Sequence, residues 1–346
     1  MCGISGAFSL EKKLTDLNLD NFFNGLSHRG PDAKGEFKDV NCKLFHNRLA
    51  ILDLTENGNQ PFYSDDKNII SISNCEIYNH KELINELKLK GYNFRSNSDA
   101  ELFSNGWSAW GEALFSKING MFSVAIYDRK NKKIILSRDK LGIKPLYYFI
   151  KDKILYFASE PSPLAKLNSN LFCLSGIISF LKTQNYLFDE TFFSNVKSLK
   201  PGSILIQDVN GLSTKSFFSL EKYILEDNHS NISSEEIDET LNAVIKSQIQ
   251  ADVSLSSNLS SGIDSSIVTS KLTNHIDKNH FQTFTAHYPE NFSYDESLEA
   301  SKFAKAHGII NNKVEINFEI FKSDINIFFR DIQMPRMGYG AFSQYV

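Results

Sequence analysis

The sequence opens MCGISG, which places a cysteine directly behind the initiator methionine. If Met1 is removed, Cys2 carries a thiol and a free α-amine on one carbon. An α-amino group titrates at roughly 8 and a free thiol at about 8.5, so the amine can accept the thiol proton near neutral pH. Cys2 is therefore a candidate N-terminal nucleophile. The alternative at this point is a cysteine that packs as a small apolar residue.

A second candidate site is the segment LSSGIDSS at 259–266, which follows a predicted strand and opens a predicted helix. A loop of small residues exposes backbone N–H groups, and the N-terminal end of a helix attracts anions. The hydroxyl groups of Ser260, Ser261 and Ser265 can add donors to a phosphate, and Asp264 can hold Mg²⁺. The alternative is ordinary helix capping, for which serine and aspartate are preferred residues.

Composition limits the classes of protein to which this chain can belong. With 346 residues and 41% hydrophobic content, the chain is long enough for two domains, each with its own core. The net charge of -4 gives no basic footprint for nucleic acid, so we expect small-molecule substrates. The four cysteines show no CxxC spacing and are too few for a disulfide scaffold. No signal peptide or run of 18 apolar residues is evident, so we expect a cytoplasmic protein that binds no membrane.

The elements that must position Cys2 are predicted by short alternating runs in the first part of the chain. The runs at 120–128 and 133–139 flank a polar turn, as do those at 145–150 and 154–160, which predicts two antiparallel hairpins. A helix is predicted to end at Gly91. Another is predicted to begin with a capping box from Ser98 to Glu101. Antiparallel strands with segregated helices indicate α+β layers.

The second part of the chain follows a different pattern. A helix opens with a capping box from Ser233 to Glu236, and its apolar face comprises Ile237, Leu241, Val244, Ile245 and Ile249. Strands are predicted at 251–260 and 282–288, with helices from Ser265 and over 295–308, the latter ended by Gly308. This alternation predicts a parallel sheet. We therefore expect a domain over 1–215, a linker over 216–232 and a second domain over 233–346.

Ordered sequence blocks over nearly the whole chain carry a family resemblance. They are MCGISG, SHRGPD at 27–32, NRLAILDL at 47–54, NQPF at 59–62, NCEIYNHKEL at 74–83, SDAE at 98–101, NGMFSVAIYD, SRDKLGIKPLYY, FASE, PGS at 201–203, LSSGIDSS and YDES at 294–297. In these blocks the chain resembles the glutamine-hydrolysing asparagine synthetases. The resemblance implies a four-layer αββα N-terminal nucleophile domain of the class II glutamine amidotransferases. It further implies a partial α/β parallel-sheet ATP-pyrophosphatase domain behind it.

The resemblance implies a role for each residue of a glutamine site. Cys2 would attack the side-chain amide of glutamine, giving a thioester and ammonia, and water would then free glutamate. The Asn74 amide and the backbone N–H of Cys75 would bind the oxyanion. Arg48 would bind the α-carboxylate, while Asp99 and the backbone near Glu76 would bind the α-ammonium. The same site would include Leu49, Ile51 and Leu52.

Two of these residues have alternative roles that require no substrate. Arg48 could instead form an ion pair at the end of a strand. Asp99 could lie in the first turn of its helix, where the helix dipole favours a negative charge.

In the second domain the resemblance implies that ATP activates aspartate with Mg²⁺ and that ammonia displaces AMP to give asparagine. The ATP-binding residues would be Leu259, Ser260, Ser261, Gly262, Asp264, Ser265 and Ala286, with Asp264 as the metal ligand. Ammonia would pass between the domains.

Three departures from the family pattern affect this assignment. Cys75 replaces a glycine, and its Cβ is either incompatible with a φ that only glycine tolerates or crowds the substrate, so we expect reduced glutaminase activity. Ser261 replaces a glycine of the phosphate loop, where it either clashes with phosphate or adds a donor. The sequence ends at Val346, whereas relatives continue for roughly 200 residues. We therefore expect a truncated synthetase domain, or a partner chain or second copy that supplies the remainder.

Three hypotheses remain. The first is a glutamine-dependent asparagine synthetase. The second is an amidotransferase of the same lineage with another acceptor, such as a sugar or a cell-surface precursor. The third is a catalytically silent glutamine-binding remnant. The changes at 75 and 261 favour it, and the presence of Cys2, Arg48, Asn74 and Asp99 opposes it.

Overall fold

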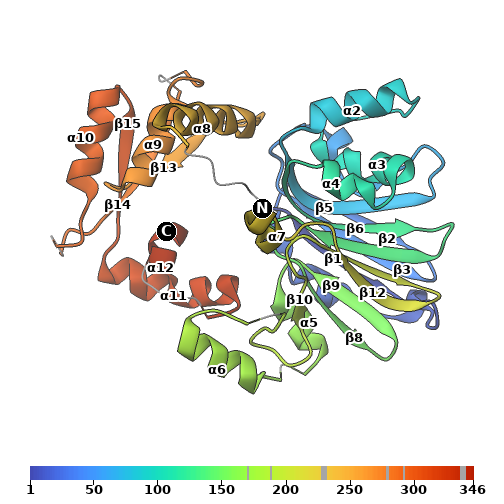
Figure 1. The fold of residues 1–346 in the computed structure, drawn as a ribbon. Coiled ribbons are helices and arrows are strands. Elements are labelled where there is room, and N and C mark those ends of the chain that lie inside the picture. The colour runs from blue at the N-terminus through green and yellow to red at the C-terminus, as the bar shows by residue number, and fades with distance from the viewer. Residues whose placement is uncertain (170, 188, 227–231, 278–279, 291–292, 336–339) are drawn as a thin grey trace. The chain divides into compact units, whose positions relative to one another are not determined.

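A computed structural model describes residues 1–346 apart from 170, 188, 227–231, 278–279, 291–292 and 336–339. The chain divides into two compact units, Met1–Asn228 and His229–Val346 (Figure 1). Within the described residues, none of the helices combines the length and the apolar character needed to cross a membrane.

The first unit contains two antiparallel sheets of six strands each. The first sheet has the spatial order β10 (Lys197–Ser198), β8 (Tyr147–Lys151), β9 (Ile154–Ala158), β1 (Gly3–Phe8), β3 (Cys42–Arg48) and β2 (Ala33–Lys38). The second has the order β12 (Gly211–Ser216), β11 (Ser203–Asp208), β7 (Lys133–Arg138), β6 (Gly120–Asp128), β5 (Ile69–Ile77) and β4 (Phe62–Tyr63). Both predicted hairpins are confirmed, as β6 with β7 and β8 with β9.

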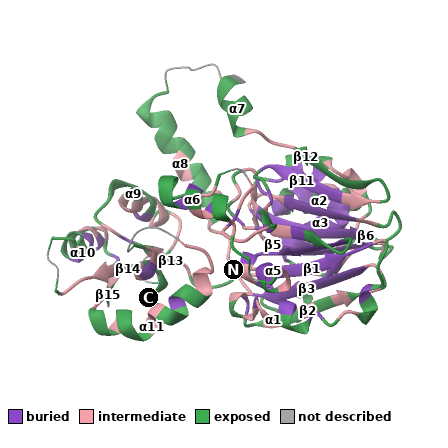
Figure 2. Ribbon diagram, turned by 90° about the horizontal axis from the view of Figure 1, so that it is seen from below, coloured by how far each residue is buried: buried purple, intermediate pink, exposed green. Residues whose placement is uncertain are grey.

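Helices cover the outer face of each sheet. The first sheet packs against α1 (Asp20–Asn24) and α5 (Pro161–Leu167), and the second against α2 (His80–Leu89), α3 (Leu102–Trp110) and α4 (Ala113–Lys117). A third apolar cluster lies between the sheets. The result is the four-layer αββα arrangement that the resemblance implied, with the strands as its buried centre (Figure 2). The unit also contains α6 (Leu174–Thr183), α7 (Leu220–Glu226) and the 3-10 helices Leu14–Asp16, Ser27–Arg29, Glu56–Gly58 and Asp99–Glu101.

Strand β1 lies at the centre of the first sheet, and all six of its residues are buried. Close packing requires a glycine at position 6, because a Cβ on Gly6 would lie 2.3 Å from the Phe157 ring. This packing fixes the strand that begins directly after Cys2.

One of the two predicted capping boxes is wrong. Ser98 does cap its turn, since its hydroxyl accepts a hydrogen bond from Ala100 N at 3.3 Å. However, the carboxylate of Glu101 turns back to the preceding loop, where it accepts from Arg95 N at 3.0 Å and Ser96 N at 2.9 Å. The Glu101 side chain is therefore already paired and does not complete the box.

Other helix ends agree with the prediction. The capping box from Ser233 to Glu236 forms with both of its hydrogen bonds. Gly91 and Gly308 follow their helices with φ of 90° and 69°, left-handed conformations that glycine adopts without strain. Helix α7 occupies part of the segment for which we expect a linker, and 227–231 lie outside the described residues.

The second unit contains a parallel sheet, as the strand and helix alternation predicts. Its three strands are β13 (Ser256–Asn258), β14 (Gln282–His287) and β15 (Ile310–Glu315), in that spatial order. The helices are α8 (Ser234–Gln248), α9 (Ile263–Leu272), α10 (Ser297–His307), α11 (Phe318–Ile332) and α12 (Gly340–Tyr345). Strand β13 is much shorter than the predicted 251–260, and α9 begins two residues before the predicted Ser265.

Candidate active site

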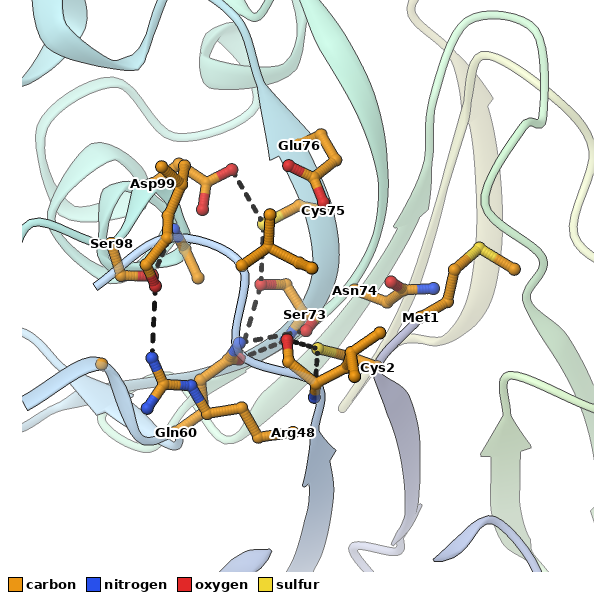
Figure 3. Close-up of a pocket in the computed structure, with 15 residues that line it drawn as sticks. Met1, Cys2, Arg48, Gln60, Ser73, Asn74, Cys75, Glu76, Ser98 and Asp99 are labelled. Atoms are coloured by element: carbon orange, nitrogen blue, oxygen red, sulfur yellow. Dashed lines mark hydrogen bonds between the residues drawn. The ribbon is translucent and has the colours of Figure 1, made fainter. Parts of the chain in front are cut away.

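A pocket in the first unit brings together every residue for which the sequence predicts a role in a glutamine site. The pocket is lined by Cys2, Arg48, Leu49, Ile51, Leu52, Asn74, Cys75, Glu76 and Asp99, and by Met1, Gly58, Gln60, Ser73, Ser98 and Ala100, which sequence reasoning did not select. The labelled side chains converge from the N-terminus, from β5 and from the segment around Asp99 (Figure 3).

Cys2 lies immediately before β1, with its thiol against the backbone of Leu49. The sulfur accepts a hydrogen bond from Leu49 N at 3.3 Å and donates to Leu49 O at 3.5 Å. Burial raises the pKa of the Cys2 thiol, so the thiol is neutral and needs a base to become a nucleophile. Burial, followed by the Arg29 charge, lowers the pKa of the Met1 α-amine, which lines the same pocket.

Three polar residues that the sequence analysis did not select support the backbone at Cys2. Arg29 donates its Nε–H to Cys2 O at 3.0 Å and its Nη1 to Glu160 Oε1 at 2.7 Å. His28 Nε2 lies 3.0 Å from the same carboxylate oxygen. The only sequence signal for this network is that its members fall in the quoted blocks SHRGPD and FASE.

Asn74 presents a donor that the described part of the chain leaves without a partner. The residue is 2% exposed, and its Nδ2 makes no hydrogen bond to any described residue. Buried polar atoms are almost always paired, and an unpaired donor is costly. Because Asn74 lines the same pocket as Cys2, this amide can serve an acceptor atom of a bound molecule.

The structure decides between the two physical effects expected of Cys75. The residue lies in β5, and its φ is negative, so the expectation of a backbone that only glycine tolerates is wrong. Its thiol instead lines the pocket, 3.4 Å from Ser73 Oγ, and donates to Asp99 Oδ2 at 3.6 Å. Burial raises the pKa of this thiol well above its usual range, so it remains a neutral donor.

Two carboxyl groups lie on the Cys75 side of the pocket. Asp99 is 5% exposed, and its Oδ2 accepts from Ile77 N at 2.7 Å. Burial raises the pKa of Asp99 to about 6. Burial, with the Asp99 charge as the next cause, raises the pKa of Glu76 to about 7. A cation bound between the two carboxyl groups would lower both pKa values again, because it favours the charged form of each group.

Arg48 holds the loop that follows β3. Its Nη1 donates to Thr55 O and Asn59 Oδ1, each at 2.8 Å, and its Nη2 donates to Leu52 O and Asp53 O. The loop packs closely on Arg48 at Gly58, where an added Cβ would lie 2.2 Å from the guanidinium. Arg48 therefore organises the loop and also lines the pocket, and neither sequence hypothesis includes the first of these roles.

The predicted ATP-binding residues are only partly brought together. Leu259, Ser260, Ser265 and Ala286 line a pocket of the second unit. Ser261, Gly262 and Asp264 are exposed and lie outside the lining of that pocket. Across the residues that the structure describes, no three His, Cys, Asp or Glu side chains form a group that could hold a metal ion.

Comparison with known proteins gives two family matches. The glutamine amidotransferase domain family matches residues 1–218, and the asparagine synthase family matches residues 236–346. Two curated relatives are the glutamine-hydrolysing asparagine synthetases 1 and 2 of Bacillus subtilis. They are 32% and 33% identical over 224 and 256 residues, which are 63% and 69% of this chain but only 35% and 34% of theirs. The chain thus spans about a third of their length.

Among solved structures, a glutamine phosphoribosylpyrophosphate amidotransferase from B. subtilis matches with a TM-score of 0.47 and 15% identity. The match covers 100% of this chain and 70% of that chain.

Proposed function

The chain belongs to the glutamine amidotransferase domain family, and from this premise we propose that it hydrolyses glutamine to glutamate and ammonia at Cys2. The observation that carries the proposal is that Asn74 Nδ2 has no partner in the described part of the chain, while Asn74 lines the same pocket as Cys2. A tetrahedral intermediate formed at Cys2 carries an oxyanion, and a preorganised donor is what such an intermediate needs.

In the proposed reaction, the α-amine exposed by removal of Met1 accepts the thiol proton. The Cys2 sulfur then attacks the amide carbon of glutamine, and the oxyanion receives hydrogen bonds from Asn74 Nδ2 and the Cys75 N–H. Collapse of the intermediate breaks the carbon–nitrogen bond, and the proton held by the amine leaves with ammonia. Water then attacks the thioester and releases glutamate.

The remaining pocket residues are proposed to read the two α-groups of free glutamine. Asp99 and Glu76 supply negative charge for the α-ammonium. Arg48 lines the same pocket and would bind the α-carboxylate by exchanging some of its hydrogen bonds to the loop for bonds to the substrate. Leu49, Ile51 and Leu52 line the same pocket. The test of the proposal is whether the purified chain releases glutamate and ammonia from glutamine in equal amounts.

For the second unit we propose the amidation of aspartate that is activated with ATP and Mg²⁺. Leu259, Ser260, Ser265 and Ala286 line a pocket that would hold ATP. Asp264 would hold Mg²⁺, because Mg²⁺ at phosphate sites commonly takes only one or two carboxylates and completes its shell with phosphate oxygens and water. We place the glutaminase domain at 1–215, the linker at 216–232 and the synthetase part at 233–346, in a cytoplasmic protein that pairs with a second copy or a partner chain.

A catalytically silent glutamine-binding remnant is the second candidate, and the position of Cys75 favours the loss of catalysis, though not the binding of glutamine. The thiol donates to Asp99 Oδ2, the atom that would accept from the α-ammonium of glutamine. An amidotransferase with a different acceptor would share the glutaminase reaction, so only the product of ammonia transfer distinguishes it.

Replacing Cys75 with glycine is expected to raise kcat/KM for glutamine about tenfold. The change frees Asp99 for the α-ammonium, and a hydrogen bond to a charged group is worth about 1.5 kcal/mol. Cys75→Ser is the matched control, since it keeps a donor beside Asp99 and should gain nothing. An analogue of glutamine without the α-amino group should also show no gain. Equal activity of Cys75→Gly and the parent would show that the thiol does not obstruct the substrate.

The KM for glutamine is expected to rise as the pH falls through about 7 and about 6, the pKa values of Glu76 and Asp99. Protonation removes the negative charges that attract the α-ammonium, and below the lower pKa each pH unit reduces the charged fraction about tenfold. Initial rates at pH 5.5 to 8 would measure this. A KM that is constant over that range would exclude both carboxylates as the ammonium site.

A further inference from the structure

The loop between β13 and α9 has three successive backbone N–H groups that donate to side-chain oxygens of the same unit. Ser260 N donates to Ser265 Oγ at 3.2 Å, and Gly262 N donates to Ser260 Oγ at 3.1 Å. Between them, Ser261 N donates to Glu296 Oε2 at 3.1 Å. Two of the three acceptors are neutral hydroxyls within the loop and helix, whereas the third is a carboxylate from a distant segment.

The residue before Glu296 is anchored to His287, at the end of β14. The Asp295 carboxylate lies 2.8 Å from His287 Nδ1 and also accepts from Ser297 N at 2.9 Å. Ser297 is buried and begins α10. Glu296 occupies the N-cap position of α10, yet its side chain makes no capping hydrogen bond to its own helix. Its carboxylate extends to the loop at Ser261 instead.

We propose that the Glu296 carboxylate occupies the Ser261 N–H in place of a phosphate. A phosphate group that binds this loop must then displace the carboxylate. The proposal rests on the proposed binding of a nucleotide phosphate at this loop. A successive set of N–H groups ahead of a helix favours an anion, and two anions cannot share one donor without repulsion. Glu296 is exposed, so its side chain has room to leave the loop while Asp295 stays bound to His287.

The test is a calorimetric titration of the full chain with inorganic pyrophosphate in the presence of EDTA. Glu296→Gln keeps an oxygen acceptor and the shape of the side chain but removes the charge. It is expected to bind pyrophosphate about tenfold more tightly than the parent, as expected when a like charge a few ångströms away is removed at an exposed site. Glu299→Gln is the control, because Glu299 is also exposed on α10 but pairs with Lys302 at 3.7 Å. It should bind as the parent does.

Unchanged or weaker binding by Glu296→Gln would overturn the proposal. The titration is repeated with Mg²⁺ to test whether Glu296 binds the metal. If the variant binds pyrophosphate more weakly than the parent only when Mg²⁺ is present, Glu296 is a metal ligand and the displacement proposal is wrong. ATP titrations separate this proposal from the proposed function. If the parent binds ATP and Glu296→Gln binds it equally well, only the displacement proposal fails. If neither chain binds ATP or pyrophosphate, both the displacement proposal and the proposed nucleotide site fail.

Discussion

Replacing Cys2 with alanine is expected to abolish the release of glutamate from glutamine, with a loss of at least about 10³-fold in kcat. The physical reason is that no other group in the reaction proposed here can form the thioester. Cys75 lines the same pocket, but burial raises its pKa well above the usual range and the residue lacks an α-amine to take its proton. The measurement is glutamate and ammonia release by the purified chain, with mass spectrometry to verify that Met1 is absent.

Cys173→Ala is the matched control for this experiment. Cys173 is a free cysteine that precedes α6, its sulfur lies 3.2 Å from Ser175 Oγ, and it is outside the pocket lining. Its replacement should leave the rate unchanged. Residual hydrolysis in Cys2→Ala at the parent rate would refute the N-terminal nucleophile. An inactive parent chain that lacks Met1 would favour the silent glutamine-binding protein.

Replacing Asn74 with alanine is expected to lower kcat for glutamine hydrolysis about 10² to 10³-fold while the KM changes little. The donor acts on charge that develops in the transition state, so its loss affects the chemical step more than binding. Because Nδ2 has no partner among the described residues, its removal breaks no hydrogen bond of that atom. Thermal unfolding should therefore show a stability equal to or higher than that of the parent.

A lower kcat without a loss of stability distinguishes a catalytic donor at Asn74 from a structural one. Asn74→Asp should also be inactive, since a carboxylate replaces the donor with a negative charge beside the oxyanion. Asn57→Ala is the control, because Asn57 is exposed and outside the pocket lining. A variant Asn74→Ala that hydrolyses glutamine normally, or that loses activity only because it unfolds, would contradict the oxyanion role.

The elements that depend on residues close together in the sequence could be predicted from the sequence. The hairpins formed by β6 with β7 and by β8 with β9 follow from alternation around short polar turns. The box at Ser233 and the helix end at Gly308 depend on residues within one helical turn. The nine residues predicted for a glutamine site line one pocket, and they were selected because they belong to sequence blocks and not from an inferred geometry.

What each side chain contacts was decided by packing between distant segments. Arg29 pairs with a Glu160 that is 131 residues away, and Ser261 donates to a Glu296 that is 35 residues away. Both segments had been quoted as sequence blocks, but no periodicity relates them to each other.

The amino-acid sequence by itself thus predicted the nucleophile, and it determined the order of the elements and nine of the residues that line the pocket. Only the tertiary structure decided that Cys75 has an ordinary φ and a thiol that donates to Asp99, and that Asn74 Nδ2 has no partner among the described residues. The reason is physical: local conformation depends on residues a few positions apart. Which polar atoms find partners depends on the two sheets and the loops above them packing into one structure.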